Sequence, residues 1–84
     1  MAVKVKIEVD KLFAESGSAK LAELEKYVKL ATELAGEGND VTITGPGPVW
    51  LYLKIAHALH GRAMKLIYSS PVTGDVTIFD HSPY

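Results

Sequence analysis

The chain has 84 residues, of which 48% are apolar and 23% are charged, so its composition is that of a globular protein and not of a disordered one. The formal net charge of −1 argues against binding to long nucleic acid through bulk electrostatics, although a few local donors are enough to hold a small anionic ligand. The chain has no cysteine, which excludes a disulfide framework and a thiol nucleophile. No apolar run reaches transmembrane length, and the first residues alternate with charges instead of forming a signal peptide. We therefore expect one cytoplasmic domain, residues 1–84, that has no membrane partner and does not bind DNA.

The first predicted element is a strand over residues 3–9, where valine and isoleucine alternate with lysine and acidic residues. A loop over 11–17 follows, and Ser18 is a candidate N-cap for the next element. From Leu21 to Leu34 apolar residues recur at helical spacing, with glutamate and lysine on the other face, which predicts an amphipathic helix. The glycines that follow end this helix.

The second half of the chain predicts one more helix among short strands. Val41 and Ile43 alternate with threonines, which indicates a strand with one buried face. Pro48 suits the first position of a helix that is apolar on most sides, and Gly61 ends that helix. The predicted elements are a strand at 41–44, a helix at 48–60, and strands at 63–69 and 75–80 that are joined by a hairpin loop.

The resulting order, β-α-β-α-β-β, predicts a two-layer α/β sandwich. The first three strands are expected to be parallel and joined by right-handed crossovers, and the fourth is expected to pair antiparallel with the third. Both helices then cover one face of a mixed four-stranded sheet, because the first strand has only one apolar face. The other face meets solvent or a second subunit and carries Lys4, Lys6, Thr42, Thr44, Lys65 and Thr77.

A turn with the sequence Gly45-Pro46-Gly47-Pro48 joins the second strand to the second helix. The first backbone N–H groups of a helix have no partner inside it, so this turn can hold an anion. Ligands also favour the carboxyl ends of the strands in open α/β sheets. Other residues are candidates to bind the same ligand by stacking, hydrogen bonding or charge. The predicted substrate-binding residues are Thr44, Gly45, Pro46, Gly47, Pro48, Trp50, Ser69, Ser70 and Arg62.

Each of these assignments has a purely structural alternative. Glycine and proline are common wherever a strand turns into a helix, and this turn lacks the Lys-Ser/Thr ending of a Walker loop. Trp50 either stacks on a base or belongs to the core of an apolar helix. Ser69 and Ser70 either donate to a phosphate or only form the hairpin turn. Arg62 is either a phosphate clamp or a solvated cation at a helix end.

The chain's histidines are predicted to gather at the opposite end of the sheet. His57 and His60 lie one turn apart near the end of the second helix, where at about 1.5 Å per residue His57 is about 15 Å below Gly47. The fourth strand descends to the same end and delivers Asp80 and His81. These side chains can bind Mn, Fe, Co, Ni or Zn, can act without metal as acid and base, or are merely polar residues at the ends of elements. All four are candidate catalytic residues, and the three histidines are candidate metal ligands.

The chain also resembles a known family. Gly45-x-Gly-Pro-Val-Trp-Leu51, then Ala56-His57-x-x-His60, and then a strand ending in His81-Ser82 follow the order found in the small CRISPR-associated Csx-three family, the ring nucleases of type III CRISPR systems. The resemblance covers residues 41–82. It implies a ferredoxin-like or CARF-like domain that dimerises, binds cyclic tetra-adenylate and cleaves it to linear adenylates with manganese as cofactor. Cleavage of poly(A) ends of RNA is also attributed to the family, whose functional histidines correspond to His57, His60 and His81.

Two motifs depart from the family pattern. The family has arginine between the two glycines, where this chain has Pro46. It also has an Asp-Pro-Arg hairpin after the third strand, where this chain has Ser69-Ser70-Pro71-Val72. An acidic group and a phosphate-binding arginine are thereby lost, for which Asp75 or Asp80 and Arg62 are substitutes outside the motif.

The resemblance favours a manganese-dependent phosphodiesterase that linearises a cyclic oligoadenylate, with cyclic tetra-adenylate as the expected ligand, and so switches off type III CRISPR signalling. The alternatives are a sensor or sponge that binds the ring without cleaving it, a nuclease for poly(A) ends of short adenylate RNA, and an oligomeric α/β domain that handles single-stranded RNA or a protein. The resemblance implies a homodimer, and because the glycine turn and the histidines lie at opposite ends, we expect this homodimer to form a higher assembly on ligand binding.

Overall fold

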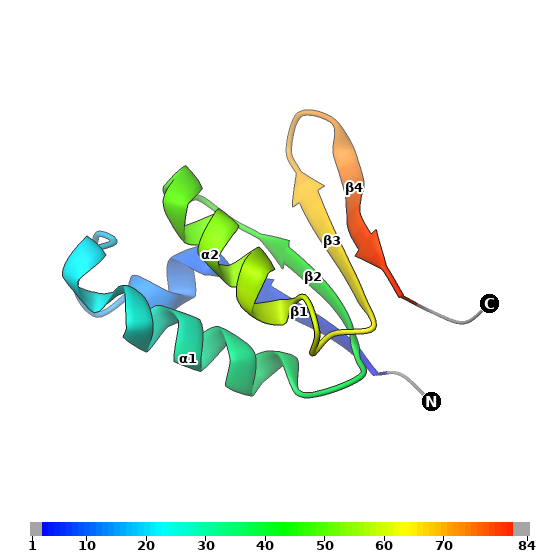
Figure 1. Ribbon diagram of the computed structural model, residues 1–84. Coiled ribbons are helices and arrows are strands. Elements are labelled where there is room, and N and C mark those ends of the chain that lie inside the picture. Colours follow the sequence, from blue (N-terminus) through cyan, green and yellow to red (C-terminus); the bar gives the residue numbers. More distant parts are fainter. Residues whose placement is uncertain (1–2, 82–84) are drawn as a thin grey trace.

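The computed structural model describes residues 3–81 and contains one sheet and two α-helices (Figure 1). The elements are β1 (Lys4–Glu8), the 3₁₀ helices η1 (Val9–Phe13) and η2 (Leu21–Glu23), α1 (Leu24–Ala35), β2 (Asp40–Thr44), α2 (Val49–Leu59), β3 (Lys65–Ser70) and β4 (Gly74–Asp80). Within residues 3–81, no helix combines the length and the apolar character that are needed to span a bilayer.

The four strands form a mixed sheet in the order β1-β2-β3-β4. The pairs β1–β2 and β2–β3 are parallel, and β4 runs antiparallel to β3. Parallel neighbours require a crossover connection, which α1 and α2 supply. Both helices lie on one side of the sheet, and β4 extends past them (Figure 1). The predicted two-layer α/β sandwich is confirmed.

An apolar core fills the space between the two layers. In α2, Leu51, Ile55 and Leu59 are buried at intervals of one helical turn, so one stripe of this helix faces the sheet. Burial of a side chain of this size stabilises the fold by about 1.5–3 kcal/mol. The helix is therefore a firm support for the turn at its start and for His60 at its end. The buried core residues are Ile7, Val9, Leu12, Tyr27, Ala31, Ala35, Val41, Ile43, Leu51, Ile55, Leu59, Ala63 and Leu66.

The start of the first helix differs from the prediction. The helix begins at Leu24, and Ser18 is not its N-cap, since η2 stands between them; η1 likewise replaces the first part of the predicted loop. The physical reason is the buried Tyr27, whose hydroxyl accepts a hydrogen bond from the Lys20 N–H (3.0 Å) and donates one to Glu23 Oε2 (3.2 Å). These bonds hold the preceding segment as a separate turn against α1.

The β3–β4 pair contains a register shift. Leu66 pairs with Phe79, whereas the next residue, Ile67, pairs with Thr77, so Ile78 is an extra residue on β4. Side chains alternate between the two faces of a strand, so an extra residue changes the face on which the following residues lie. Phe79 thereby joins Leu66 on the helix side, where it packs against the core.

The face of the sheet away from the helices is polar, as predicted. Lys4, Asp40, Lys65 and Asp80 pair in register across all four strands, which gives a row of alternating charge. Opposite charges on neighbouring strands stabilise a sheet modestly. The position of Asp80 is explained by this row, because the register shift places its side chain on the same face as that of Lys65.

Candidate functional site

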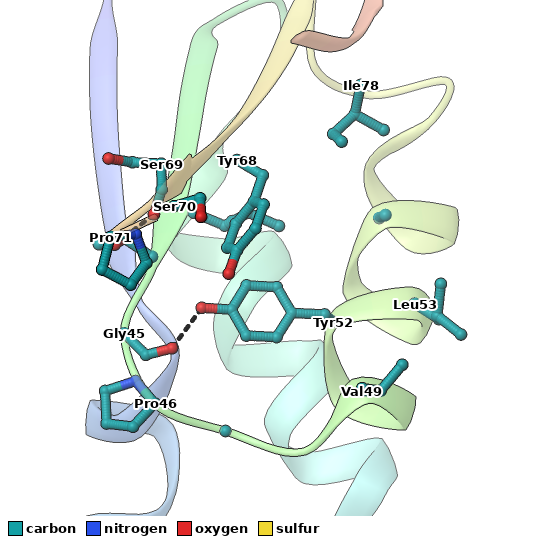
Figure 2. A pocket seen from close by; sticks show the side chains of 14 residues that line it. Gly45, Pro46, Val49, Tyr52, Leu53, Tyr68, Ser69, Ser70, Pro71 and Ile78 are labelled. Carbon is teal, nitrogen blue, oxygen red and sulfur yellow. Dashed lines mark hydrogen bonds between the residues drawn. The ribbon is translucent and has the colours of Figure 1, made fainter. Parts of the chain in front are cut away.

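A groove of about 750 Å³ opens between α2 and the β3–β4 hairpin, at the carboxyl end of β2 (Figure 2). Two sides of the groove are apolar, because Val49 and Leu53 line it from α2 and Ile78 lines it from β4. The sequence-predicted substrate-binding residues that line it are Thr44, Gly45, Pro46, Gly47, Ser69 and Ser70.

The glycine turn at one end of the groove is tightly packed. Gly45 has a φ of +101°, which favours glycine, and a Cβ atom at this position would collide with the Asp10 carboxylate. A Cβ atom on Gly47 would lie 2.9 Å from Val9 Cγ1. Both glycines are therefore required by contact with the segment that follows β1, against which the turn packs closely.

Tyr52 fastens this turn to α2. Its hydroxyl donates a hydrogen bond to the Gly45 carbonyl, and its ring meets the Tyr68 ring edge to face at a centroid distance of 5.1 Å (Figure 2). Burial, with smaller contributions from Tyr68 and Asp10, raises the pKa of Tyr52 to about 12. The phenol therefore stays protonated and remains a donor at physiological pH. Tyr52 was not selected from the sequence, because no local pattern distinguishes it from the other large side chains of this apolar helix.

Thr44 and Ser70, two of the hydroxyl side chains that line the groove, already form hydrogen bonds to the backbone of β3 and of the hairpin turn. The Thr44 hydroxyl donates to the Ser69 carbonyl at 3.0 Å, which ties β2 to β3. Ser70 Oγ accepts hydrogen bonds from the N–H groups of Val72 (3.1 Å) and Thr73 (3.3 Å), which closes the hairpin turn. None of the described residues that line the groove carries a charge. Recognition in this groove would thus depend on hydroxyls, backbone groups and ring faces.

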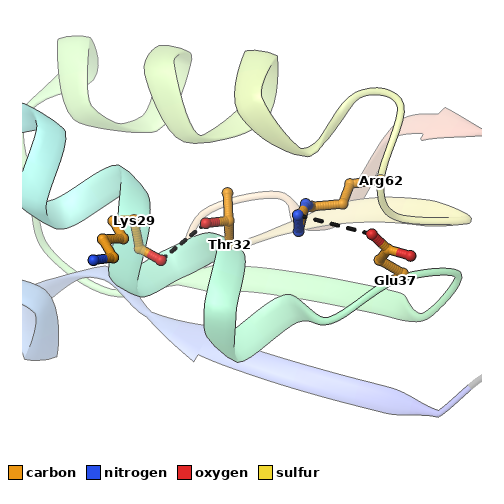
Figure 3. Close-up of polar contacts among 4 residues, drawn as sticks. All are labelled: Lys29, Thr32, Glu37 and Arg62. Carbon is orange, nitrogen blue, oxygen red and sulfur yellow. Dashed lines mark hydrogen bonds and ion pairs between the residues drawn. The ribbon is translucent and has the colours of Figure 1, made fainter.

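Three predicted substrate-binding residues do not line the groove. Pro48 is the N-cap of α2, and Trp50 packs against the core, which agrees with its structural alternative. Arg62 follows α2 at its far end, where its Nη2 lies 3.8 Å from Glu37 Oε1 (Figure 3). Both side chains of this pair are substantially exposed, so the ion pair contributes little to stability.

Two of the predicted catalytic histidines meet at that far end of the molecule. The rings of His60 and His81 are in edge contact at a centroid distance of 4.8 Å. His60 is the C-cap of α2 with a ψ of 60°, so the chain leaves the helix there, whereas His57 stays on the exposed helix surface. Within residues 3–81, no three histidine, cysteine or acidic side chains are grouped closely enough to hold a metal ion.

The groove and the histidine pair lie at opposite ends of β3. Ser69 and Ser70 line the groove, whereas Lys65, at the other end of the strand, pairs with Asp80 beside His81. At about 3.3 Å per residue, the two ends of β3 are roughly 16 Å apart. A ligand held at the glycine turn is therefore out of reach of that protomer's own imidazole pair unless it extends along the groove toward Ala56 and Ile78, which also line it.

Residues 17–84 match the profile of the family described as CRISPR-associated protein (Cas_csx3). The chain belongs to this family. The matched region contains the glycine turn, the groove and both histidines of the pair, so the predicted resemblance is confirmed. No curated protein and no solved structure matches the chain.

The raised pKa of Tyr52 predicts how stability depends on pH. The phenol titrates near pH 10 in the unfolded chain and near 12 in the folded one, so its contribution is complete below pH 10 and is lost as the pH rises through 12. We expect the difference in unfolding free energy between the wild type and Tyr52→Phe to be about 1 kcal/mol at pH 8, the size of one hydrogen bond, and to shrink between pH 10 and 12. Urea unfolding of both proteins across this range measures it. A difference that does not change with pH would contradict the assignment.

Proposed function

We propose that the protein is a phosphodiesterase that binds a cyclic oligoadenylate, with cyclic tetra-adenylate as the expected ring, and opens it to linear adenylate. Such a reaction would remove a second messenger and switch off type III CRISPR signalling. The observation that supports it most is the ring contact between His60 and His81, at 4.8 Å, in a member of a CRISPR-associated family. Two imidazoles at this separation can act together on one phosphodiester.

The chemistry requires a base and an acid. One neutral imidazole accepts the proton of the attacking oxygen, from water or from a ribose 2′-hydroxyl, while a protonated imidazole donates to the oxygen that leaves. Histidine suits both tasks because its ordinary pKa lies near neutrality. We assign the proton donation to His60, which is fixed at the end of the buried helix α2, and the proton acceptance to His81.

Manganese remains part of the proposal. In a metal-dependent version of the mechanism, in which His60 and His81 would be ligands instead of acid and base, they would provide two nitrogens in one protomer, and the described residues do not complete a metal-binding group. Further ligands would have to come from water, from substrate phosphate, or from His57 of a neighbouring copy. A bound divalent cation would supply positive charge against the scissile phosphate.

A non-cleaving binder is the second candidate. The groove has no charged lining residue among those described, and Asp10 lies directly behind its glycine turn. The hairpin contributes Ser69 and Ser70 in place of an acidic group and an arginine. Such a groove can hold adenine rings against Tyr68 by stacking but offers little charge for phosphate. These features fit a sensor or sponge for the ring.

Incubation with cyclic adenylates of different ring sizes, with and without manganese, separates the two candidates. We expect cyclic tetra-adenylate to be converted to linear product. His60→Ala should bind the ring with nearly unchanged affinity and reduce turnover by about 10²-fold or more, because a general acid is lost. Unchanged turnover would remove His60 from the mechanism, and binding without any linear product in the wild type would establish the sponge. His57→Ala in parallel tests whether that imidazole acts from a neighbouring copy.

The distance between the groove and the imidazole pair predicts a dependence on assembly. A ring in the groove of one copy must meet the imidazoles of another copy, so turnover per protomer should rise as the protein is concentrated. Initial rates measured over a dilution series that crosses dissociation of the oligomer, with the oligomer size followed by light scattering, provide the test. Turnover per protomer that stays constant through dissociation would show that one protomer suffices.

A further inference from the structure

We propose that Phe79 is a positioning residue that holds the two imidazoles of the histidine pair in their mutual orientation. The inference rests on the proposed function for its effect on turnover, but the orientation itself can be measured without any substrate. Phe79 was not a candidate in the sequence interpretation, because it lies in a short apolar run of the last strand.

Phe79 contacts both histidines. Its ring stacks on His81 with a centroid distance of 4.8 Å and an interplanar angle of 28°, and it meets His60 edge to face at 5.2 Å. Since the two histidine rings also contact one another at 4.8 Å, the three rings form a closed triangle. A change in the orientation of any one ring therefore disturbs the other two.

Phe79 is the anchored member of this triangle. It is partly buried and packs against the apolar core, whereas both histidines are exposed. It pairs with Leu66, which is fully buried, and His81 follows on the same side of the chain, where its N–H donates to the Met64 carbonyl at 2.8 Å. Phe79 thus contacts the buried core on one side and the two exposed imidazoles on the other.

The choice of phenylalanine has a chemical consequence. A phenyl ring restricts rotation of a neighbouring imidazole by contact alone, and it neither donates nor accepts a proton. A carboxylate in the same place would occupy a ring nitrogen by hydrogen bonding. Phe79 therefore orients both imidazoles while it leaves their nitrogens available for proton transfer. Aromatic contacts of this kind change the population of a favoured orientation by a factor of about 2–10 each.

The register shift in β4 is what brings Phe79 to this place. If β4 continued from Val76 without the register shift, alternation would put residues 78 and 80 on the helix side. Asp80, and not Phe79 or His81, would then face His60. The register shift therefore places the rings of Phe79 and His81 beside His60 at the end of α2.

The test compares Phe79→Leu with Phe79→Tyr, which keeps the ring. In the wild type, the ring current of Phe79 should displace the ring protons of His60 and His81 in the NMR spectrum, with an upfield displacement for His81, which stacks on the phenyl ring. We expect Phe79→Leu to remove this displacement for both, with the resonances of His57 unchanged as the internal control. We also expect kcat to fall about tenfold, with KM and the affinity for cyclic tetra-adenylate nearly unchanged, because binding occurs in the distant groove. Phe79→Tyr should retain both the displacement and kcat to within about twofold.

Two results would overturn the inference. One is unchanged His60 and His81 resonances in Phe79→Leu, and the other is a wild-type kcat despite the loss of the displacement. If the wild type cleaves no ring at all, the proposed function fails, and the NMR comparison alone still decides whether Phe79 orients the imidazoles.

Discussion

The pairing register of β4 against β3 is the constraint on which the histidine end depends. One extra residue, Ile78, decides whether Asp80 or His81 lies on the side of the sheet where α2 ends. With the shift in place, the carboxylate completes a row of alternating charge on the open face, and the imidazole meets His60 and Phe79 on the other. A strand defect of this kind changes the chemistry of an edge without changing the fold.

The second constraint is the length of α2 and β3, which separates two different environments. At one end, Tyr52 and the segment after β1 contact the glycine turn beside an uncharged groove. At the other end, rings on α2 and β4 meet at the surface. The helix between them is anchored by Leu51, Ile55 and Leu59, so the two ends cannot approach one another within one protomer.

The order of elements could be predicted because each has its own periodicity: alternation in the strands and an apolar stripe in the helices. The prediction of the site was less complete. The spacing of His57 and His60 predicts one helix face, but His60 lies where the chain leaves the helix, and only His60 meets His81. Tyr52 and Phe79 act through contacts between distant segments, which no local pattern contains. The one available sign was the adjacent pair Ile78-Phe79, which interrupts the alternation of the last strand.

The central claim is that the groove of one copy acts together with the imidazole pair of another, and mixing two inactive variants tests it most directly. Leu53→Glu places a negative charge on the exposed rim of the groove, and His60→Ala removes one imidazole at the other end. Each variant alone should cleave poorly, the first because it binds the ring weakly and the second because it lacks the acid. The account predicts that the mixture recovers activity, since an intact groove and an intact imidazole pair then meet within one assembly. A mixture that cleaves no faster than the sum of its two components would contradict the account.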